Sequence, residues 1–329
     1  MRRVSILLIA FALFVPMTAP RAENVVRITT SSNTDATRNG VYVWVKAFSD
    51  AMMRGGFRIV LFPNSALGKE EERTDLLQQN LIQMNVAGGQ EISAFSPLFG
   101  GLELPFLFDG YKQLDNLFHR TPFLTRVNEQ LVPHGFAVVD AALLGGMGGL
   151  FNTRRPIRTL DDLKGLRLRA MEASQLQVIR SWGVPGTQVA WEEVPQALQT
   201  GVADGYINPP LVPVMFGHTS QIKFFTALEM APAQRVVVAS RAWLERMDAR
   251  ERRVFRDAVL AARTANRAWT ADMRRRELAI LQDAGVTITT PTARARLAFV
   301  EATRARYGAI APREIVDALL ALLEQAKVP

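Results

Sequence analysis

The chain has 329 residues, a formal net charge of +8 and no cysteine. The lack of cysteine excludes disulfide bonds, thiol catalysis and cysteine-ligated metal sites, and the chain is long enough to bury a core without such cross-links. The positive net charge would be compatible with nucleic-acid binding. However, most arginines cluster among Glu and Asp in the last third of the chain, as on a solvated helix face.

Residues 1–22 have the features of an export signal. A short basic start precedes an apolar run of about a dozen residues, and cleavage after Ala22 or Ala19 is expected. An uncleaved anchor is the alternative, although the run is too short to span a bilayer comfortably. We therefore predict a signal peptide over 1–22 and a soluble mature chain in the periplasm, where no nucleic-acid partner is expected.

The first part of the mature chain alternates strands and helices. The expected elements are a strand Val25–Thr30, a helix Val41–Met53, a strand Phe57–Phe62, a helix Glu70–Gln79 and a strand Leu81–Ala87. Asn33 lies in the polar turn after the first strand. This alternation predicts a parallel α/β domain.

A second α/β unit follows a strand, Phe136–Leu144, that enters the glycine-rich stretch 145–149. No Lys-Ser or Lys-Thr follows these glycines, so they do not form a phosphate loop. The elements expected after them are the strands Leu150–Asn152, Leu166–Ala170, Gln188–Trp191 and Gly205–Asn208, the helices Ser174–Trp182 and Glu193–Thr200, further strands within Phe224–Ser240, nearly continuous helix from Arg241 to Ala284, and a last helix from about Pro312 to Gln325.

Three residues of this second unit end consecutive expected strands. They are Arg169, Trp191 and Asn208. Ligands of doubly wound sheets bind outside the carboxyl ends of the strands. Arginine can hold a carboxylate with two parallel hydrogen bonds, asparagine can donate another, and tryptophan offers a flat apolar wall. The spacing therefore indicates a site for a small carboxylate.

Each of these residues also has a purely structural interpretation. Arg169 could pair with Glu172 at a sheet edge, and Trp191 could belong to the core. Asn208 precedes a proline and could be a turn residue. Spacing alone leaves both interpretations open.

The order of motifs resembles the solute receptors of tripartite ATP-independent periplasmic (TRAP) transporters, the dicarboxylate-receptor-like DctP family. The matching segments cover most of the chain from Val25 to about Trp243. They are Phe62–Gly68, Leu104–Phe108, Asn152–Ile157, Asp162–Arg169, Glu193-Val194 with Ala197–Gly201, and Asp204-Gly205 with Asn208-Pro209.

This resemblance implies two doubly wound α/β domains that close around an organic acid, with a long C-terminal helix across both. The expected domains are 23–145 plus 235–273 and 146–234 plus 274–329. In the family, the arginine matching Arg169 pairs with the ligand carboxylate, the asparagine matching Asn208 helps to hold it, and an aromatic residue at the position of Trp191 lines the pocket. Asn33, in the first domain, is a further candidate ligand-binding residue.

Two departures from the family pattern bear on the ligand. Gly148 stands where many members carry another arginine, so it is a candidate ligand-binding position that lacks one charge. Tyr206 and Ile207 replace the usual Gln-Glu before the asparagine. Together with Trp191, they predict a monocarboxylate with an apolar or aromatic body.

The three histidines, His119, His134 and His218, lie in unrelated segments without metal spacing or a nucleophile motif. We therefore expect no catalytic residue, no metal and no cofactor. The leading hypothesis is a monomeric solute receptor that delivers an organic acid to a TRAP permease. The alternatives are a ligand sensor that docks on a receptor kinase and a secreted hydrolase, against which the missing nucleophile argues.

Overall fold

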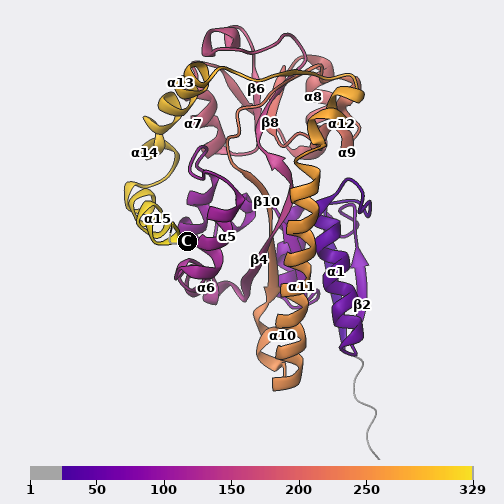
Figure 1. The fold of residues 1–329 in the computed structure, drawn as a ribbon. Helices are drawn as coiled ribbons and strands as arrows, with labels where there is room; N and C mark the ends of the chain where they lie inside the picture. Colours follow the sequence, from indigo (N-terminus) through magenta and orange to yellow (C-terminus); the bar gives the residue numbers. More distant parts are fainter. Residues whose placement is uncertain (1–23, 328–329) are drawn as a thin grey trace, which may run out of the picture.

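The computed structural model describes residues 24–327, and the expected signal peptide at 1–22 lies outside them. The strands within 24–327 form two sheets, each with apolar side chains packed on both faces (Figure 1). We call each sheet with its helices the first unit and the second unit. This arrangement confirms the α/β architecture expected from the sequence. Within the described residues no helix is both long enough and apolar enough to cross a membrane.

The first unit contains five strands within the described chain, in the order β2-β1-β3-β10-β4. Strands β1, β2 and β3 are parallel, whereas β10 runs antiparallel to both β3 and β4. The strands are β1 (Val25–Thr30), β2 (Arg58–Phe62), β3 (Met84–Ala87), β4 (Phe136–Met147) and β10 (Pro232–Ser240). Because β10 lies between β3 and β4, a segment from late in the sequence completes the interior of the sheet.

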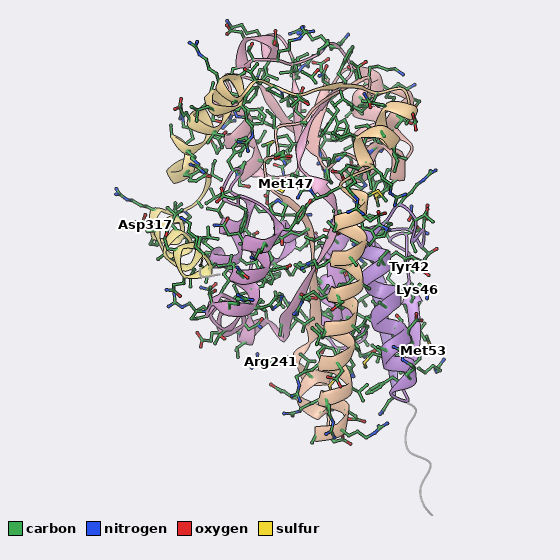
Figure 2. The ribbon with its side chains drawn as sticks, in the orientation of Figure 1. Tyr42, Lys46, Met53, Met147, Arg241 and Asp317 are labelled. Atoms are coloured by element: carbon green, nitrogen blue, oxygen red, sulfur yellow. The ribbon has the colours of Figure 1, made fainter. Side chains whose placement is uncertain are left out.

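Helices cover both faces of this sheet. On one face, α1 and α11 bury Trp44, Phe48 and Phe255 against the strands, and the outer side of α1 carries Lys46 and the half-exposed Met53 (Figure 2). On the other face, short helices and α15 bury a second apolar cluster. The helices of this unit are α1 (Gly40–Arg54), α2 (Glu70–Gln78), α3 (Gly89–Ser93), α4 (Pro97–Gly100), α5 (Tyr111–Arg120), α6 (Phe123–Leu131), α10 (Arg241–Arg246), α11 (Ala249–Met273) and α15 (Arg313–Ala326).

The second unit contains six strands within the described chain, in the order β11-β9-β5-β8-β6-β7. Strand β6 is parallel to β7 and β8, whereas β5 is antiparallel to β8 and β9. The strands are β5 (Gly149–Asn152), β6 (Leu168–Ala170), β7 (Gly186–Gln188), β8 (Gly205–Asn208), β9 (Phe224–Thr226) and β11 (Thr287–Thr289), and the helices are α7 (Ala173–Ser181), α8 (Val194–Thr200), α9 (Val212–Met215), α12 (Glu277–Asp283), α13 (Ala293–Arg304) and α14 (Tyr307–Ile310).

The two units are joined by segments that cross between the sheets. Strand β4 leads into β5 through Gly148, and β9 returns to β10 through residues 227–231. These two crossings are hydrogen-bonded to each other, from Gly148 N to Ala231 O and from Met230 N to Gly148 O, both at 2.9 Å. Met147, at the end of β4, lies in the middle of the molecule (Figure 2). The units are therefore connected by paired, short crossings.

Two elements differ from the sequence expectation. Strand β3 begins only at Met84, because Asn80 adopts a positive φ of 55° in a turn after α2. The expected helix from Arg241 to Ala284 is divided into α10, α11 and α12, and Asp248 caps α11 by accepting from Glu251 N at 2.8 Å. The long helix α11 packs on the first unit and continues toward the second (Figure 1).

Helix α15 lies on the first unit. Leu319 and Leu322 are buried in the cluster formed with α4 and α5, and Asn116 Nδ2 donates to Ala326 O at 2.9 Å. The sequence-based division placed all of 274–329 in the second domain, so the structure differs from it for this helix. The reason is the apolar face of α15, which finds its partner across the molecule.

Candidate functional site

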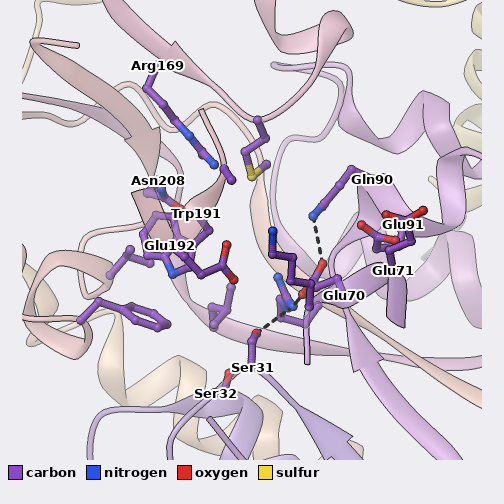
Figure 3. A pocket seen from close by; sticks show the side chains of 17 residues that line it. Ser31, Ser32, Glu70, Glu71, Gln90, Glu91, Arg169, Trp191, Glu192 and Asn208 are labelled. Carbon is purple, nitrogen blue, oxygen red and sulfur yellow. Dashed lines mark hydrogen bonds and ion pairs between the residues drawn. The ribbon is translucent and has the colours of Figure 1, made fainter. Parts of the chain in front are cut away.

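A cavity of about 300 Å³ lies between the two units, and residues of both line it (Figure 3). The first unit contributes Ser31, Ser32, Lys69, Glu70, Glu71, Gln90, Glu91, Leu144 and Arg235. The second unit contributes Arg169, Met171, Ala190, Trp191, Glu192, Asn208, Val212 and Phe216. Three of the five candidate residues, Arg169, Trp191 and Asn208, are therefore brought together in one cavity.

Arg169 is a buried cation on strand β6, which lies between β8 and the edge strand β7. The residue is only 2% exposed, and its Nε donates a hydrogen bond to Val189 O at 2.9 Å. Nη1 is buried and has no acceptor among the described residues. Burial lowers the pKa of Arg169 to about 10, so it remains charged at neutral pH. A buried, hydrogen-bonding cation without a full set of acceptors is suited to an incoming carboxylate.

The alternative pairing of Arg169 with Glu172 is not what the structure shows. Glu172 accepts a hydrogen bond from Ser174 Oγ at 2.7 Å, and Arg169 forms no ion pair with the described residues. The guanidinium instead lies 5.7 Å from the centre of the Trp191 ring. The arginine therefore faces an aromatic wall, and its Nη1 has no acceptor among the described residues.

Trp191 does not end a strand as expected. Strand β7 ends at Gln188, and Trp191 begins a short 3-10 helix, Trp191–Glu193, that precedes α8. Its ring packs against Phe216 at 5.0 Å and Tyr206 at 6.2 Å between centroids. The tryptophan thus lies partly in an aromatic cluster and partly on the cavity surface, which combines the core and the pocket interpretations.

A histidine also belongs to this aromatic cluster. His218 Nδ1 lies 3.2 Å from the hydroxyl of Tyr206, and its ring centroid is 5.1 Å from that of Trp191. Burial, and next the nearby charge of Arg169, lowers the pKa of His218. The imidazole is therefore neutral at physiological pH and adds no positive charge to that of Arg169.

Asn208 ends β8 as the sequence predicts. Its Nδ2 is buried and has no acceptor among the described residues. Because β8 is the neighbour of β6 in the sheet, Asn208 and Arg169 present unfilled N–H donors at the same edge (Figure 3). Two such donors favour a ligand oxygen at this end of the cavity.

The opposite wall belongs to the first unit and was not predicted from the sequence. Arg235 on β10 forms an ion pair with Glu70 at the start of α2, and its Nη2 donates to Ser31 Oγ at 3.0 Å. Glu70 also accepts from Gly88 N at 3.1 Å and Gln90 Nε2 at 3.0 Å (Figure 3). The sequence signal for this wall is a charged residue, Arg235, directly before the apolar run Val236–Ala239.

Asn33 and Gly148 do not line this cavity. The Oδ1 of Asn33 accepts from Asp35 N at 3.2 Å and Asn39 Nδ2 at 3.2 Å, so the side chain holds its own loop. Gly148 lines a separate cavity of about 100 Å³ that also contains Glu103 and Glu172. A Cβ atom at Gly148 would be 3.8 Å from the nearest atom, Ala231 O, so a methyl group fits there.

Within residues 24–327 no three His, Asp or Glu side chains gather as metal ligands would. The arrangement provides charge, hydrogen-bond donors and an aromatic wall around a cavity between the two units. Such a site binds and orients a small molecule without covalent chemistry.

The model of the family described as bacterial extracellular solute-binding protein, family 7 (DctP) matches residues 29–313. The protein YiiZ of Salmonella typhimurium is 21% identical over 241 residues, which cover 73% of each chain. The C4-dicarboxylate-binding periplasmic protein DctP of Rhodobacter capsulatus is 29% identical over 164 residues, which cover 47% of this chain and 46% of that protein. The sugar acid binding protein DctPAm of Advenella mimigardefordensis, solved with galactonate, superposes with a TM-score of 0.83 at 21% identity, covering 93% of this chain and 99% of that chain.

Proposed function

The chain belongs to the bacterial extracellular solute-binding proteins of family 7, and from that premise we propose that its cavity binds an organic acid with one carboxylate. Members of this family are binding proteins and not enzymes. The observation that carries the proposal is that Arg169 and Asn208 each have a buried N–H donor without a hydrogen-bond acceptor among the described residues, at one end of the cavity. A carboxylate oxygen supplies the acceptor that both lack.

The charge of Arg169 sets the chemical class at this end. A carboxylate brought beside Arg169 gains a charge-assisted hydrogen bond inside a water-poor cavity, where the attraction is stronger than in water. A neutral amide of the same shape accepts a hydrogen bond but brings no charge. The site is therefore expected to discriminate between an acid and its amide.

The body of the ligand is expected to be apolar or aromatic. Beyond Arg169 the second unit presents Trp191, Val212 and Phe216, and the first unit adds Leu144. A flat or apolar ligand body removes this surface from water, at about 25 cal/mol per Å². The cavity thus supports a monocarboxylate with such a body better than a fully hydroxylated chain.

The relatives' names support the broader class. The Rhodobacter protein is named for C4-dicarboxylates and the Advenella structure holds galactonate, so both ligands are organic acids. By analogy with the TRAP transporters, we expect this receptor to act in the periplasm as a monomer and to deliver its ligand to a TRAP permease. Ligand binding between the units would favour a closed form that the permease recognises.

A thermal-shift screen with matched acids and amides tests the proposal. The mature protein is heated with phenylpropanoate, indoleacetate, galactonate and succinate, each beside its amide. A ligand that binds only the folded state raises the melting temperature with concentration. We expect at least one acid, and not its amide, to stabilise the wild type.

The same screen is repeated on two variants. Arg169→Gln removes the charge, and Arg167→Ala removes an exposed arginine two residues away as the matched control. The stabilising acid should lose its effect only with Arg169→Gln. Equal stabilisation by an acid and its amide, or an unchanged shift in a folded Arg169→Gln protein, would refute the proposed carboxylate site.

A further inference from the structure

Two arginines face the cavity from opposite units, and their charges are balanced differently. Arg169 has no acidic partner within ion-pair distance among the described residues. Arg235 is paired with Glu70, which also forms a 3.3 Å ion pair with the buried Arg73 behind it. Arg169 at the second-unit end is therefore not ion-paired, although Glu192 lines the same side of the cavity and acts on it through its charge, whereas Arg235 at the first-unit end is ion-paired directly.

Arg235 nevertheless keeps an unused donor. Its Nη2 is committed to Ser31 and Glu70, but its Nε is buried without an acceptor among the described residues. An unfilled buried N–H is costly, so a ligand oxygen that meets it gains binding free energy. Glu70 holds the guanidinium in place through its own contacts with Gly88 and Gln90, so the donor is fixed before a ligand arrives.

The charges around Arg235 select the kind of oxygen. Glu71 and Glu91 line the same wall as Glu70, and the pKa of Glu91 is raised by burial and then by the neighbouring Glu71. The cations Lys69, Arg73 and Arg235 offset these three carboxylates, so the wall has no spare positive charge. A second ligand carboxylate would be placed against like charges, whereas a hydroxyl or carbonyl oxygen would not.

We propose that Arg235 is a specificity-determining residue, whose Nε donates to an uncharged oxygen at the end of the ligand opposite its carboxylate. Arg169 and Asn208 read the carboxylate, and the Arg235–Glu70 pair reads a hydroxyl or carbonyl and disfavours a dicarboxylate. This inference rests on the proposed function, because it takes Arg169 as the partner of the single carboxylate.

Two matched sets of acids test the inference by isothermal titration of the full mature chain. One set is phenylpropanoate with its para-hydroxy and para-carboxy derivatives. The other is pentanoate, its terminal hydroxy derivative and glutarate. In the set that fits the cavity, the hydroxy acid should bind about ten- to a hundredfold more tightly than the unsubstituted acid, as hydrogen bonds to charged groups do. The dicarboxylate should bind more weakly than the hydroxy acid.

Two variants assign the preference to Arg235. Arg235→Lys keeps a cation beside Glu70 but has no Nε donor, so the preference for the hydroxy acid should fall to nearly one while the melting temperature is retained. Arg235→Gln should also lose the preference, and serves if the lysine side chain repositions. Arg27→Lys, at an exposed arginine on β1 of the same sheet, is the matched control and should keep the wild-type preference.

The outcomes separate this inference from the proposed function. Binding that needs Arg169 but shows no preference for the hydroxy acid would overturn the role of Arg235 alone. A folded Arg235→Lys protein that keeps the preference, a dicarboxylate that binds most tightly, or a failure of all six acids to bind would overturn it as well. Binding that survives Arg169→Gln would instead overturn the proposed function.

Discussion

The carboxylate of Glu277 accepts a hydrogen bond from the backbone N–H of Gly146 at 2.6 Å. Glu277 is the first residue of α12, and Gly146 lies near the end of β4, so the bond joins two segments at the passage between the units. The hydroxyl of Tyr111 donates to the carbonyl of the adjacent Gly145, and Arg274 stacks over the Tyr111 ring at 5.1 Å. These contacts attach the starts of α5 and α12 to the end of β4.

The buried Glu277 predicts a pH dependence of stability. Burial raises its pKa to about 7, although the Gly146 bond and Arg274 act in the opposite direction and Glu229 adds to the rise. The folded state therefore binds this proton more tightly than the unfolded state, whose carboxyl has the ordinary value of 4.5. The contribution of this carboxyl to the free energy of unfolding is fully present below about pH 4.5. It is lost as the pH rises through about 7.

Glu277→Gln keeps an acceptor for Gly146 and removes the titration. We expect the variant to be more stable than the wild type at pH 8, by up to about 3 kcal/mol, and similar to it at pH 4.5. Urea unfolding at a series of pH values measures this difference. Glu301→Gln, at an exposed position of α13, is the control, and a Glu277→Gln curve parallel to the wild type would show that the carboxyl does not titrate as stated.

Arg169→Ala should weaken binding of the acid found in the thermal-shift screen by at least about 2 kcal/mol, as removal of one partner of a buried, hydrogen-bonded charge pair does. The loss should exceed that of Asn208→Ala, because asparagine contributes a neutral donor and arginine a charged one. Titration calorimetry of both variants gives the two values. The reverse order would mean that the carboxylate is held mainly by the amide.

The neighbouring glycines 148 and 149 should respond oppositely to alanine. A Cβ at Gly148 meets nothing closer than 3.8 Å, whereas at Gly149 it would lie 2.5 Å from the ring of Phe225 and from Thr226 O. Gly148→Ala should leave the melting temperature nearly unchanged, and Gly149→Ala should cost about 1–3 kcal/mol through overpacking. Thermal unfolding compares them directly, and a destabilised Gly148→Ala would show that this crossing needs glycine for another reason.

Asn266 on α11 is a buried polar anchor between three elements. Its Nδ2 donates to Gly40 O at 2.8 Å and Leu143 O at 3.0 Å, and its Oδ1 accepts from Leu143 N at 2.9 Å. Asn266→Leu would leave these backbone groups without partners, at about 1–3 kcal/mol for each unsatisfied group. Urea unfolding should therefore show a loss of several kcal/mol, whereas the exposed Thr264→Ala should change little. A loss below about 1 kcal/mol would mean that the backbone groups find other partners.

The sequence predicted the position of a residue in the fold best where that position depends on a local strand end. Arg169 and Asn208 lie where the pattern placed them, since strand ends, glycines and prolines mark them within a few residues. Trp191 was placed in a strand but begins a 3-10 helix, because short strands such as β7 carry little pattern. Its side chain still reaches the cavity, since the main-chain path differs by only a few residues.

The first-unit wall could not be derived in the same way. Arg235 and Glu70 are 165 residues apart in the sequence, and they meet because β10 inserts between β3 and β4. Periodicity reports which face of an element is apolar, but it does not report which distant element lies beside it. The packing of α15 on the first unit was not predicted for the same reason.

The insertion of β10 between β3 and β4 has a consequence for how the chain is made. A nascent chain that has been synthesised through residue 231 carries β1, β2, β3 and β4, yet β3 and β4 are not neighbours in the finished sheet. Their facing edges offer unpaired backbone groups until residues 232–240 emerge. We expect the first half of the chain to remain dependent on holding factors until that point, and a chain truncated before β10 to aggregate.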